Sequence, residues 1–359
     1  MSFSKPLKII VGLSGGVDSS VSALLLKQQG HQVEGIFMKN WEEDDTDSHC
    51  SAQEDIKDAQ SVCDNLGIKL HKVNFAQEYW DNVFTYFLNT YKNGQTPNPD
   101  ILCNKEIKFK LCLNYAFEYL GADYFATGHY AQIINHKLIK ACDKTKDQTY
   151  FLYTLSQNLL NKILFPIGHL LKSDVRKIAL QHNLVTHNKK DSTGICFIGE
   201  RKFKSFLQKY LPAQKGIIEN IDGKKIGHHD GLMYYTIGQR QGIQIGGQRA
   251  GTGEPFYVVG KDIHRNTLIV AQGHSHPILY SKQLTFNDPH FIQPAQFPLK
   301  CFAKIRYRQQ EEPCVVATMD HIRYTVHFDS PQWAISPGQS IVLYDNDQCL
   351  GGGIITEND

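Results

Sequence analysis

Residues 7–30 read LKIIVGLSGGVDSSVSALLLKQQG, in which an apolar run, a glycine turn and a helical pattern follow one another. The run LKIIVGL is typical of a buried strand, and apolar residues then recur at helical spacing from Val17 until Gly30. Glycines at such a turn let the backbone approach phosphate closely, and the helix N-terminus presents free N–H groups and a positive dipole end. The stretch therefore predicts a strand, a phosphate-binding loop and a helix.

The loop SGGVDSS (residues 14–20) matches neither of two common nucleotide motifs. It lacks the G-x-x-x-x-G-K-[ST] of a P-loop and the G-x-G-x-x-G of a dinucleotide fold. For a lone S-G-G, the simpler interpretation is that Asp18 and Ser19 merely cap the helix. If the loop binds a nucleotide, Asp18 is a plausible carboxylate for the accompanying Mg²⁺.

The first two hundred residues continue the alternation of strand and helix. Further strands are predicted at VEGIFMK, IKLHKVNF and DYFATGHY, and further helices around 77–92 and 107–120. This order favours a mostly parallel sheet with right-handed crossovers, whose ligand crevice lies at the carboxyl ends of the strands.

The pattern changes after Phe203. Glycine-rich segments of short alternating strands run from Gly216 to Gly273, and antiparallel β segments separated by Pro, Gly and Asp turns follow. We therefore expect the α/β class, with an N-terminal parallel-sheet, Rossmann-like domain, a small β-rich central domain and a C-terminal antiparallel β-barrel. The expected domains are 1–205, 206–274 and 275–359.

Composition excludes several classes of protein. A length of 359 residues corresponds to two or three domains, and 38 Lys and Arg against 36 Asp and Glu give a net charge of +2. Bulk charge therefore predicts neither a nucleic-acid nor a membrane partner. No apolar run is long enough to span a membrane, and the N-terminus resembles no targeting segment, so we expect a cytoplasmic protein without a membrane partner.

Two of the nine cysteines have unusual neighbours. Cys103 lies in TPNPDILCNK, just before the helix expected from Ile107, where the helix dipole and Lys105 would favour a thiolate. Asp100 could be the acid or base beside it. Cys196 lies in DSTGICFIGE, between two glycines. On these local features alone, two buried loop cysteines remain the simpler interpretation.

Other polar clusters are less informative. The His228-His229-Asp230 cluster has no matching ligand spacing and there is no C-x-x-C pair, so no metal site is predicted. The basic run RKFK at 201–204 is best interpreted as a solvated helix face. Arg306-Tyr307-Arg308, on a predicted strand, combines cations with a ring that can stack on a base, which suits RNA.

Nine segments considered together resemble one family. The loop SGGVDSS is similar to the PP-loop of ATP pyrophosphatases, and the whole set resembles the bacterial tRNA-specific 2-thiouridylases. The segments are SGGVDSS, FMKNWEEDD, TPNPDILCNKEIKF, ATGHYA, KDQTYFLY, DSTGICFIGER, YTIGQRQG, RYRQ and CLGGG.

The resemblance implies an ATP-dependent 2-thiolation of the wobble uridine of tRNA. AMP would be transferred to the uracil C2 oxygen with release of pyrophosphate, and sulfur from a cysteine persulfide would then displace AMP. The implied cofactors are ATP and Mg²⁺, and the implied partners are tRNA and a sulfur donor, either a persulfide-donating relay protein or a cysteine desulfurase. Two alternatives remain open: a PP-loop synthetase that uses a nitrogen nucleophile, and a non-catalytic RNA-binding protein.

The resemblance also implies roles for individual residues. Cys103 is expected to be the nucleophile and Cys196 the persulfide carrier, and the two could end as a disulfide. The target base is expected to meet Asn98, Pro99 and Asp100. The residues expected around ATP are Gly12, Leu13, Ser14, Gly15, Gly16, Val17, Asp18, Ser19, Met38 and Gly128. Those expected against tRNA are His129, Lys146, Asp147, Gln148, Tyr307, Arg308 and Gln339.

Overall fold

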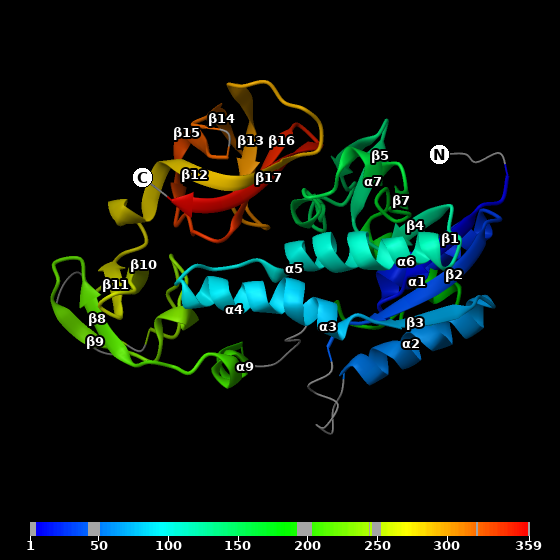
Figure 1. The fold of residues 1–359 in the computed structure, drawn as a ribbon, viewed down its shortest axis with the longest axis horizontal. Helices are drawn as coiled ribbons and strands as arrows, with labels where there is room; N and C mark the ends of the chain where they lie inside the picture. Colours follow the sequence, from blue (N-terminus) through cyan, green and yellow to red (C-terminus); the bar gives the residue numbers. More distant parts are fainter. Residues whose placement is uncertain are drawn as a thin grey trace.

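A computed structural model describes residues 5–41, 51–191, 203–243, 245, 253–320 and 322–357. Within these ranges the strands form three sheets, which Figure 1 shows with the parallel sheet on the right, the barrel above and the smaller sheet at the lower left. None of the helices in the described ranges is long and apolar enough to cross a membrane.

The N-terminal sheet is parallel and has the strand order β3-β2-β1-β4-β7. Its strands are β1 (Lys8–Gly12), β2 (Gln32–Lys39), β3 (Leu70–Asn74), β4 (Tyr124–Thr127) and β7 (Ile163–Leu164). Alternate strand residues face opposite sides, so Ile9 and Val11 join one core while Ile10 joins the other. Both faces are therefore apolar, as a parallel sheet covered by helices requires.

Helices cover both faces of this sheet. Those that pack on the Ile9 side are α1 (Val17–Gln28), α2 (Ser51–Leu66) and α8 (Lys172–Gln181). Those on the Ile10 side are α3 (Ala76–Tyr79), the π-helical η1 (Trp80–Phe84), α4 (Thr85–Lys92), α5 (Pro99–Leu102), the π-helical η2 (Cys103–Cys112) and α6 (Leu113–Glu118). Shorter helices elsewhere are η3 (Thr149–Phe151), α7 (Gln157–Leu160), α9 (Phe203–Tyr210), η4 (Leu232–Tyr234) and η5 (Pro277–Leu279).

The remaining strands build a small sheet and a closed barrel. The small sheet has the order β10-β11-β8-β9, formed by β8 (Gly216–Asn220), β9 (Lys225–His229), β10 (Phe256–Asp262) and β11 (Thr267–Gln272). The barrel closes because β12 pairs with both β15 and β17. Its strands are β12 (Tyr280–Phe291), β13 (Leu299–Lys304), β14 (Glu312–Thr318), β15 (Tyr324–Trp333), β16 (Ser340–Asp345) and β17 (Gln348–Glu357). The expected fold class is confirmed.

A hairpin that the sequence analysis missed joins the N-terminal region to the barrel. It consists of β5 (Ala131–Ile134) and β6 (Lys137–Lys140), and β6 pairs with β17. The buried Lys140 ammonium binds the Glu311 carboxylate at 2.5 Å and the Asn346 carbonyl at 2.6 Å, both in the barrel region. The barrel is therefore attached to the N-terminal region by the β6–β17 pairing and by an ion pair whose ammonium group is buried.

The helix that carries Cys103 begins earlier than expected. The sequence analysis placed its start near Ile107, but α5 begins at Pro99 and continues through η2 and α6. The Asn98 side chain accepts a hydrogen bond from the Ile101 N–H at 3.4 Å, and proline suits the first helical position because it has no N–H to satisfy. The expectation that Cys103 precedes the helix was wrong: it lies inside a continuous helical segment, and the argument from the helix dipole does not apply to it.

Candidate functional site

The predicted phosphate loop connects β1 to α1 with its N-terminal backbone groups available. Gly15 has a φ of +75°, and Gly16 is the N-cap residue in an extended conformation. Ser19 Oγ donates to the Gly16 carbonyl at 3.1 Å, and no described side chain caps the helix. The alternative in which Asp18 and Ser19 act as caps is therefore wrong, and the free N–H groups suit an anion.

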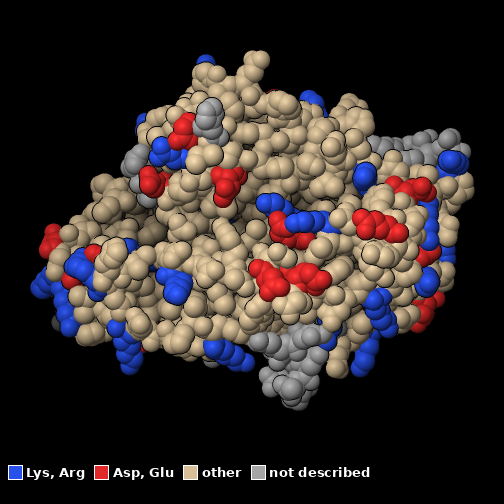
Figure 2. Space-filling model, viewed as in Figure 1, with Lys and Arg blue, Asp and Glu red and all other residues tan. Residues whose placement is uncertain are grey.

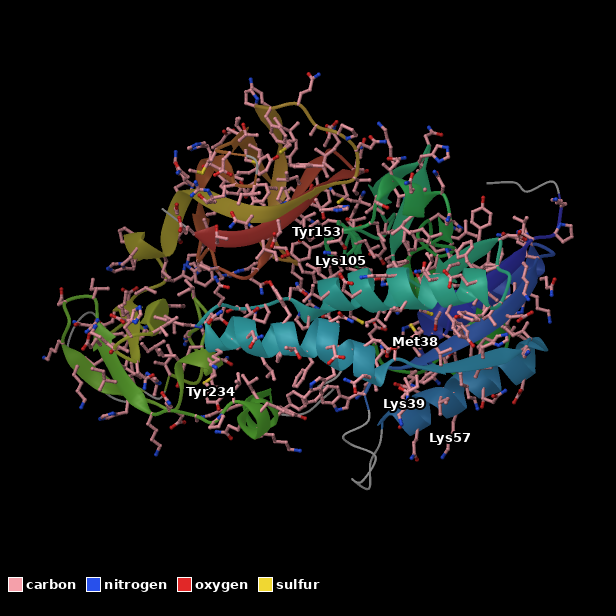
Figure 3. The ribbon with its side chains drawn as sticks, viewed as in Figure 1. Met38, Lys39, Lys57, Lys105, Tyr153 and Tyr234 are labelled. Carbon is pink, nitrogen blue, oxygen red and sulfur yellow. The ribbon has the colours of Figure 1, made fainter. Side chains whose placement is uncertain are left out.

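Residues expected around ATP come together from the carboxyl ends of three parallel strands. Gly12 ends β1, Met38 lies near the end of β2, as Figure 3 shows, and Gly128 follows β4 directly. A Cβ at Gly128 would lie 2.6 Å from the Ser19 backbone nitrogen, so the loop after β4 packs directly on the first turn of α1. The carboxyl-end edge beside a central strand is where ligands bind in sheets of this kind.

Asp18 is the centre of a charged network that the sequence analysis did not foresee. The Tyr130 hydroxyl donates to Asp18 Oδ1 at 2.8 Å, and Lys172 Nζ lies 2.7 Å from both carboxylate oxygens. Burial, and then the negative charge of Asp18, raise the pKa of Tyr130. Lys172 also binds Asp191 at 2.8 Å. The expected metal ligand is thus a carboxylate already paired with an ammonium group.

Asp191 extends this network toward two further cations. Lys146 and Arg176 bind its carboxylate at 2.7 and 2.9 Å. Burial alone would raise the pKa of Asp191, but the hydrogen bonds from Lys146 and Lys172 outweigh it and lower the pKa to about 2. Asp191 therefore stays ionised and holds the three cations beside the phosphate loop.

The missed residues of this network differ in the signal that they left in the sequence. Tyr130 lies in ATGHYA and Asp191 begins DSTGICFIGER, so both stood in segments that carried the family resemblance. Lys172 and Arg176 lie on α8, outside those segments. Only the three-dimensional fold brings Lys172 to Asp18 and Arg176 to Asp191.

The Cys103 segment lies under the barrel with its thiol enclosed. Cys103 is only 1% exposed and begins η2, and the buried Asn104 next to it donates from Nδ2 to the Phe151 carbonyl at 3.1 Å. Pro99 is buried and Asp100 half-buried on the preceding turn. Cys196 lies outside the residues that the structure describes, so its pairing with Cys103 stays a prediction.

Two residues expected against tRNA have side chains in the protein interior. The His129 ring packs between Phe109 and Phe165, bonds Thr127 Oγ1 at 2.8 Å and is 8% exposed, and burial lowers its pKa well below the usual value. Asp147 is 5% exposed and accepts bonds from the Ala141 N–H and the Thr149 hydroxyl. In this conformation neither side chain faces a surface that RNA can reach.

Four other residues expected against tRNA lie nearer the surface and differ in how their side chains are bonded within the protein. Lys146 pairs with Asp191, and Gln148 Oε1 accepts from the Tyr130 N–H at 2.9 Å. Arg308 is exposed, and the half-buried Tyr307 packs on Phe151 with ring centroids 4.4 Å apart.

The basic segment 306–308 does not lie on a strand, as the sequence analysis expected. It forms the turn after β13, which ends at Lys304. The Arg306 guanidinium donates to the Ala334 and Ile237 carbonyls and stacks over the Trp333 ring. Arg306 is therefore a bridge between backbone segments rather than the phosphate contact that its position in the sequence suggested.

Comparison with known proteins gives full-length matches. The family models that match are the tRNA methyl transferase HUP domain over residues 7–200, the tRNA methyl transferase PRC-barrel domain over 204–272 and the Aminomethyltransferase beta-barrel domain over 281–355. The "tRNA-specific 2-thiouridylase MnmA" of Pseudoalteromonas translucida is 58% identical, covering 99% of this chain and 99% of the relative. That of Tolumonas auensis is 60% identical, covering 99% and 98%. A solved "4-thiouridine synthetase - RNA complex with bound ATP" is 16% identical, covers 56% of this chain and 49% of that one, and has a TM-score of 0.35, which is too low to support an inference.

Gly15→Ala is expected to destabilise the protein more than Gly30→Ala. Both glycines have positive φ, +75° and +83°, where an alanine costs about 1–2 kcal/mol. At Gly15 the new Cβ would also lie 2.4 Å from the Asp55 carbonyl oxygen, whereas Gly30 has open space around it. Urea unfolding of the two variants measures the difference, and equal losses would contradict this packing.

Asp191→Asn is expected to lower stability in a pH-dependent way. Because the pKa of Asp191 is lowered from 3.8 to about 2, ionised Asp191 stabilises the fold above about pH 4, and this contribution is lost as pH falls toward 2. The free-energy difference between wild type and variant should therefore be largest near neutral pH and shrink in acid. Asp174→Asn, which removes an exposed carboxylate paired with Lys177, is the control. A difference that stays constant with pH would contradict the network.

Proposed function

Because this chain belongs to the family of tRNA-specific 2-thiouridylases, we propose that it places sulfur on C2 of the wobble uridine of tRNA in an ATP-dependent reaction. The observation that carries the proposal is the identity of 58–60% over nearly the whole chain, which spans the parallel sheet, the small sheet and the barrel. The phosphate loop supports the proposal independently. No described side chain caps the N-terminus of α1, so its N–H groups suit the phosphates of ATP. We assign catalysis to residues 1–205, tRNA binding to 275–359 and the reaction to the cytoplasm.

The first step activates the uridine oxygen. The C2 oxygen of uracil is a poor leaving group, so it attacks the α-phosphorus of ATP, forming a C2–O–P linkage and releasing pyrophosphate. The N–H groups of the α1 N-terminus bind phosphate oxygens, and Lys172 is close enough to Asp18 to supply a further positive charge there. Asp18 is the residue that we propose holds Mg²⁺, which would neutralise charge on the phosphates when bound.

The second step delivers sulfur. A donor protein transfers a sulfur atom to Cys196, and the resulting persulfide is attacked by the Cys103 thiolate at Sγ of Cys196. The S–S bond of the persulfide breaks, a Cys103–Cys196 disulfide forms, and the hydrosulfide that leaves attacks C2 and expels AMP together with the original oxygen. A thiol reductant must then supply two electrons to restore both cysteines. The donor belongs to one of two classes, a persulfide relay protein or a cysteine desulfurase.

Replacing each cysteine should separate the two steps. Cys196→Ser should still adenylate tRNA but accept no sulfur, whereas Cys103→Ser should carry a persulfide on Cys196 and yield no thiouridine. Labelled-sulfur transfer followed by persulfide trapping and mass spectrometry measures both, with Cys142→Ser, at an exposed cysteine, as the control.

Any of three results would overturn this scheme. Label trapped on Cys103 alone would reverse the two roles. Full tRNA-dependent release of AMP and pyrophosphate by both variants, with no sulfur entering tRNA even from the wild type, would favour a PP-loop synthetase with a nitrogen nucleophile. The lack of any tRNA-dependent pyrophosphate release from the wild type would favour the non-catalytic RNA-binding alternative.

Binding of tRNA should depend on local contacts rather than on bulk charge. On the face seen in Figure 2, Lys and Arg are interspersed with Asp and Glu instead of forming a continuous basic surface. Arg308 is an exposed cation in the turn after β13, beside the half-buried Tyr307 ring on which a base could stack. We propose these two residues as tRNA contacts.

Arg308→Ala is expected to weaken tRNA binding and to lower its salt dependence. Loss of one phosphate contact should reduce the slope of log K against log salt by about 1. Arg323→Ala is the matched control, since Arg323 is an exposed barrel arginine that is paired with Asp320. Anisotropy titrations at several salt concentrations measure both. An unchanged slope for Arg308→Ala would remove it from the tRNA interface.

A further inference from the structure

The segment 94–97 leads from α4 into the helix that carries Cys103, and the barrel binds it from one side. The Thr96 N–H donates to the Pro337 carbonyl at 2.9 Å. The Gln339 side-chain amide donates from Nε2 to the Thr96 carbonyl at 2.9 Å and to the Pro97 carbonyl at 3.3 Å. Gln339, which the sequence analysis expected against tRNA, thus directs its N–H groups at the protein backbone.

The small sheet and its connections bind the same segment from another side. Lys261, on β10, donates from Nζ to the Gly94 carbonyl at 2.7 Å. Burial lowers the pKa of Lys261 to about 8. The Thr236 and Thr96 hydroxyl oxygens lie 3.1 Å apart. Residues 94–97 of the N-terminal region therefore contact both the barrel and the central part.

Close packing at Gly338 makes this meeting possible. Gly338 has a φ of +89°, and a Cβ there would lie 2.9 Å from both the backbone nitrogen and the carbonyl oxygen of Thr96. The barrel backbone thus packs directly on Thr96, and a side chain at position 338 would push the two segments apart.

The path of this segment depends on these contacts because it belongs to no helix or strand. α4 ends at Lys92 and α5 begins at Pro99. The N–H groups of Gly94 and Gln95 still bond to the last turn of α4, but Thr96 and Pro97 lie beyond it. Backbone groups there need other partners, and the Gln339 amide satisfies two consecutive carbonyls. From Pro99 the chain is helical through Cys103, so a shift at Thr96 and Pro97 would move Asn98, Asp100 and the Cys103 thiol together.

We propose that Gln339 is a positioning residue for sulfur transfer, acting from the barrel by fixing Thr96 and Pro97 and hence the placement of Asn98, Asp100 and Cys103. This inference rests on the proposed function, because it assigns the segment its catalytic use. The contact between Gln339 and tRNA that the family resemblance implies is the alternative role. The two roles make opposite predictions for kinetics: loss of a positioning residue lowers turnover, whereas loss of an RNA contact weakens tRNA binding.

The kinetic test compares Gln339→Ala with Gln339→Glu. The second variant keeps the shape of the side chain but replaces the donating amide with a carboxylate that faces two carbonyls. Both should lower kcat for thiolation at least about tenfold and leave the tRNA Kd and KM within about twofold of wild type. Gln348→Ala is the control, because that barrel amide contacts Gln293 and not the segment. Thr236→Val, which removes one hydroxyl with little change in volume, should give a smaller loss of the same kind.

A second readout does not depend on thiolation. Cys103 is 1% exposed, so its rate of alkylation by iodoacetamide, followed site by site with mass spectrometry, reports how firmly the segment is held. Gln339→Ala and Gln339→Glu should raise that rate several-fold, and Gln348→Ala should not. Raised alkylation in variants of a protein that shows no thiolation would uphold the positioning role and remove the proposed function. An increase in tRNA Kd with unchanged kcat and unchanged alkylation would overturn the positioning role and return Gln339 to the RNA interface.

Discussion

The site depends on the close packing of the Gly128 backbone against the first turn of α1. Any side chain at this position would press its Cβ to within 2.6 Å of the Ser19 backbone nitrogen, so the end of β4 can reach the phosphate loop only through glycine. Tyr130, two residues later, then reaches Asp18 with its hydroxyl. The chain continues directly into β5 and β6, which join the barrel through β17. One glycine contact thus sets the geometry of the loop, of its acidic residue and of the connection to the barrel.

The charged residues around the phosphate loop are better suited to binding an anion than to stabilising the fold. Lys172, Lys146 and Arg176 surround Asp18 and Asp191, and the side chains of all but Lys172 are about a third exposed. Ion pairs at that exposure contribute only modestly to folding, because water screens them and ordering the side chains costs entropy. They do keep three cations within reach of the α1 N-terminus, where the phosphates of a nucleotide would bind. The segment before the helix of Cys103 is held differently: hydrogen bonds from the barrel and from the small sheet fix residues 94–97.

Local patterns in the sequence were sufficient for the repeating elements and insufficient for long-range partners. LKIIVGL and the segments after Gly216 predicted the parallel sheet, the small sheet and the barrel. Such elements can be predicted because the side chains that they bury recur along the sequence with the period of a strand or helix. The β5–β6 hairpin was missed although its own pairing is local, with Asn135 and His136 at positive φ in its turn. Its contact with β17, some two hundred residues away along the chain, leaves no local pattern. The start of α5 was missed because Asn98 and Pro99 were not recognised as a cap and a first helical residue. Lys172, Arg306 and Gln339 acquire their partners only through tertiary contacts. The burial of His129 and Asp147 likewise follows from tertiary packing, and their expected contacts with tRNA stay predictions.

The central claim is that ATP serves to turn the uridine C2 oxygen into a leaving group. The most direct test uses tRNA whose wobble uridine carries oxygen-18 at C2, incubated with the protein, ATP, Mg²⁺ and a persulfide donor. If AMP is attached to that oxygen and then displaced by sulfur, the AMP recovered by mass spectrometry carries one oxygen-18 and the pyrophosphate carries none, in proportion to the thiouridine formed. Thiouridine formed alongside unlabelled AMP, or with the label in water or pyrophosphate, would contradict the account.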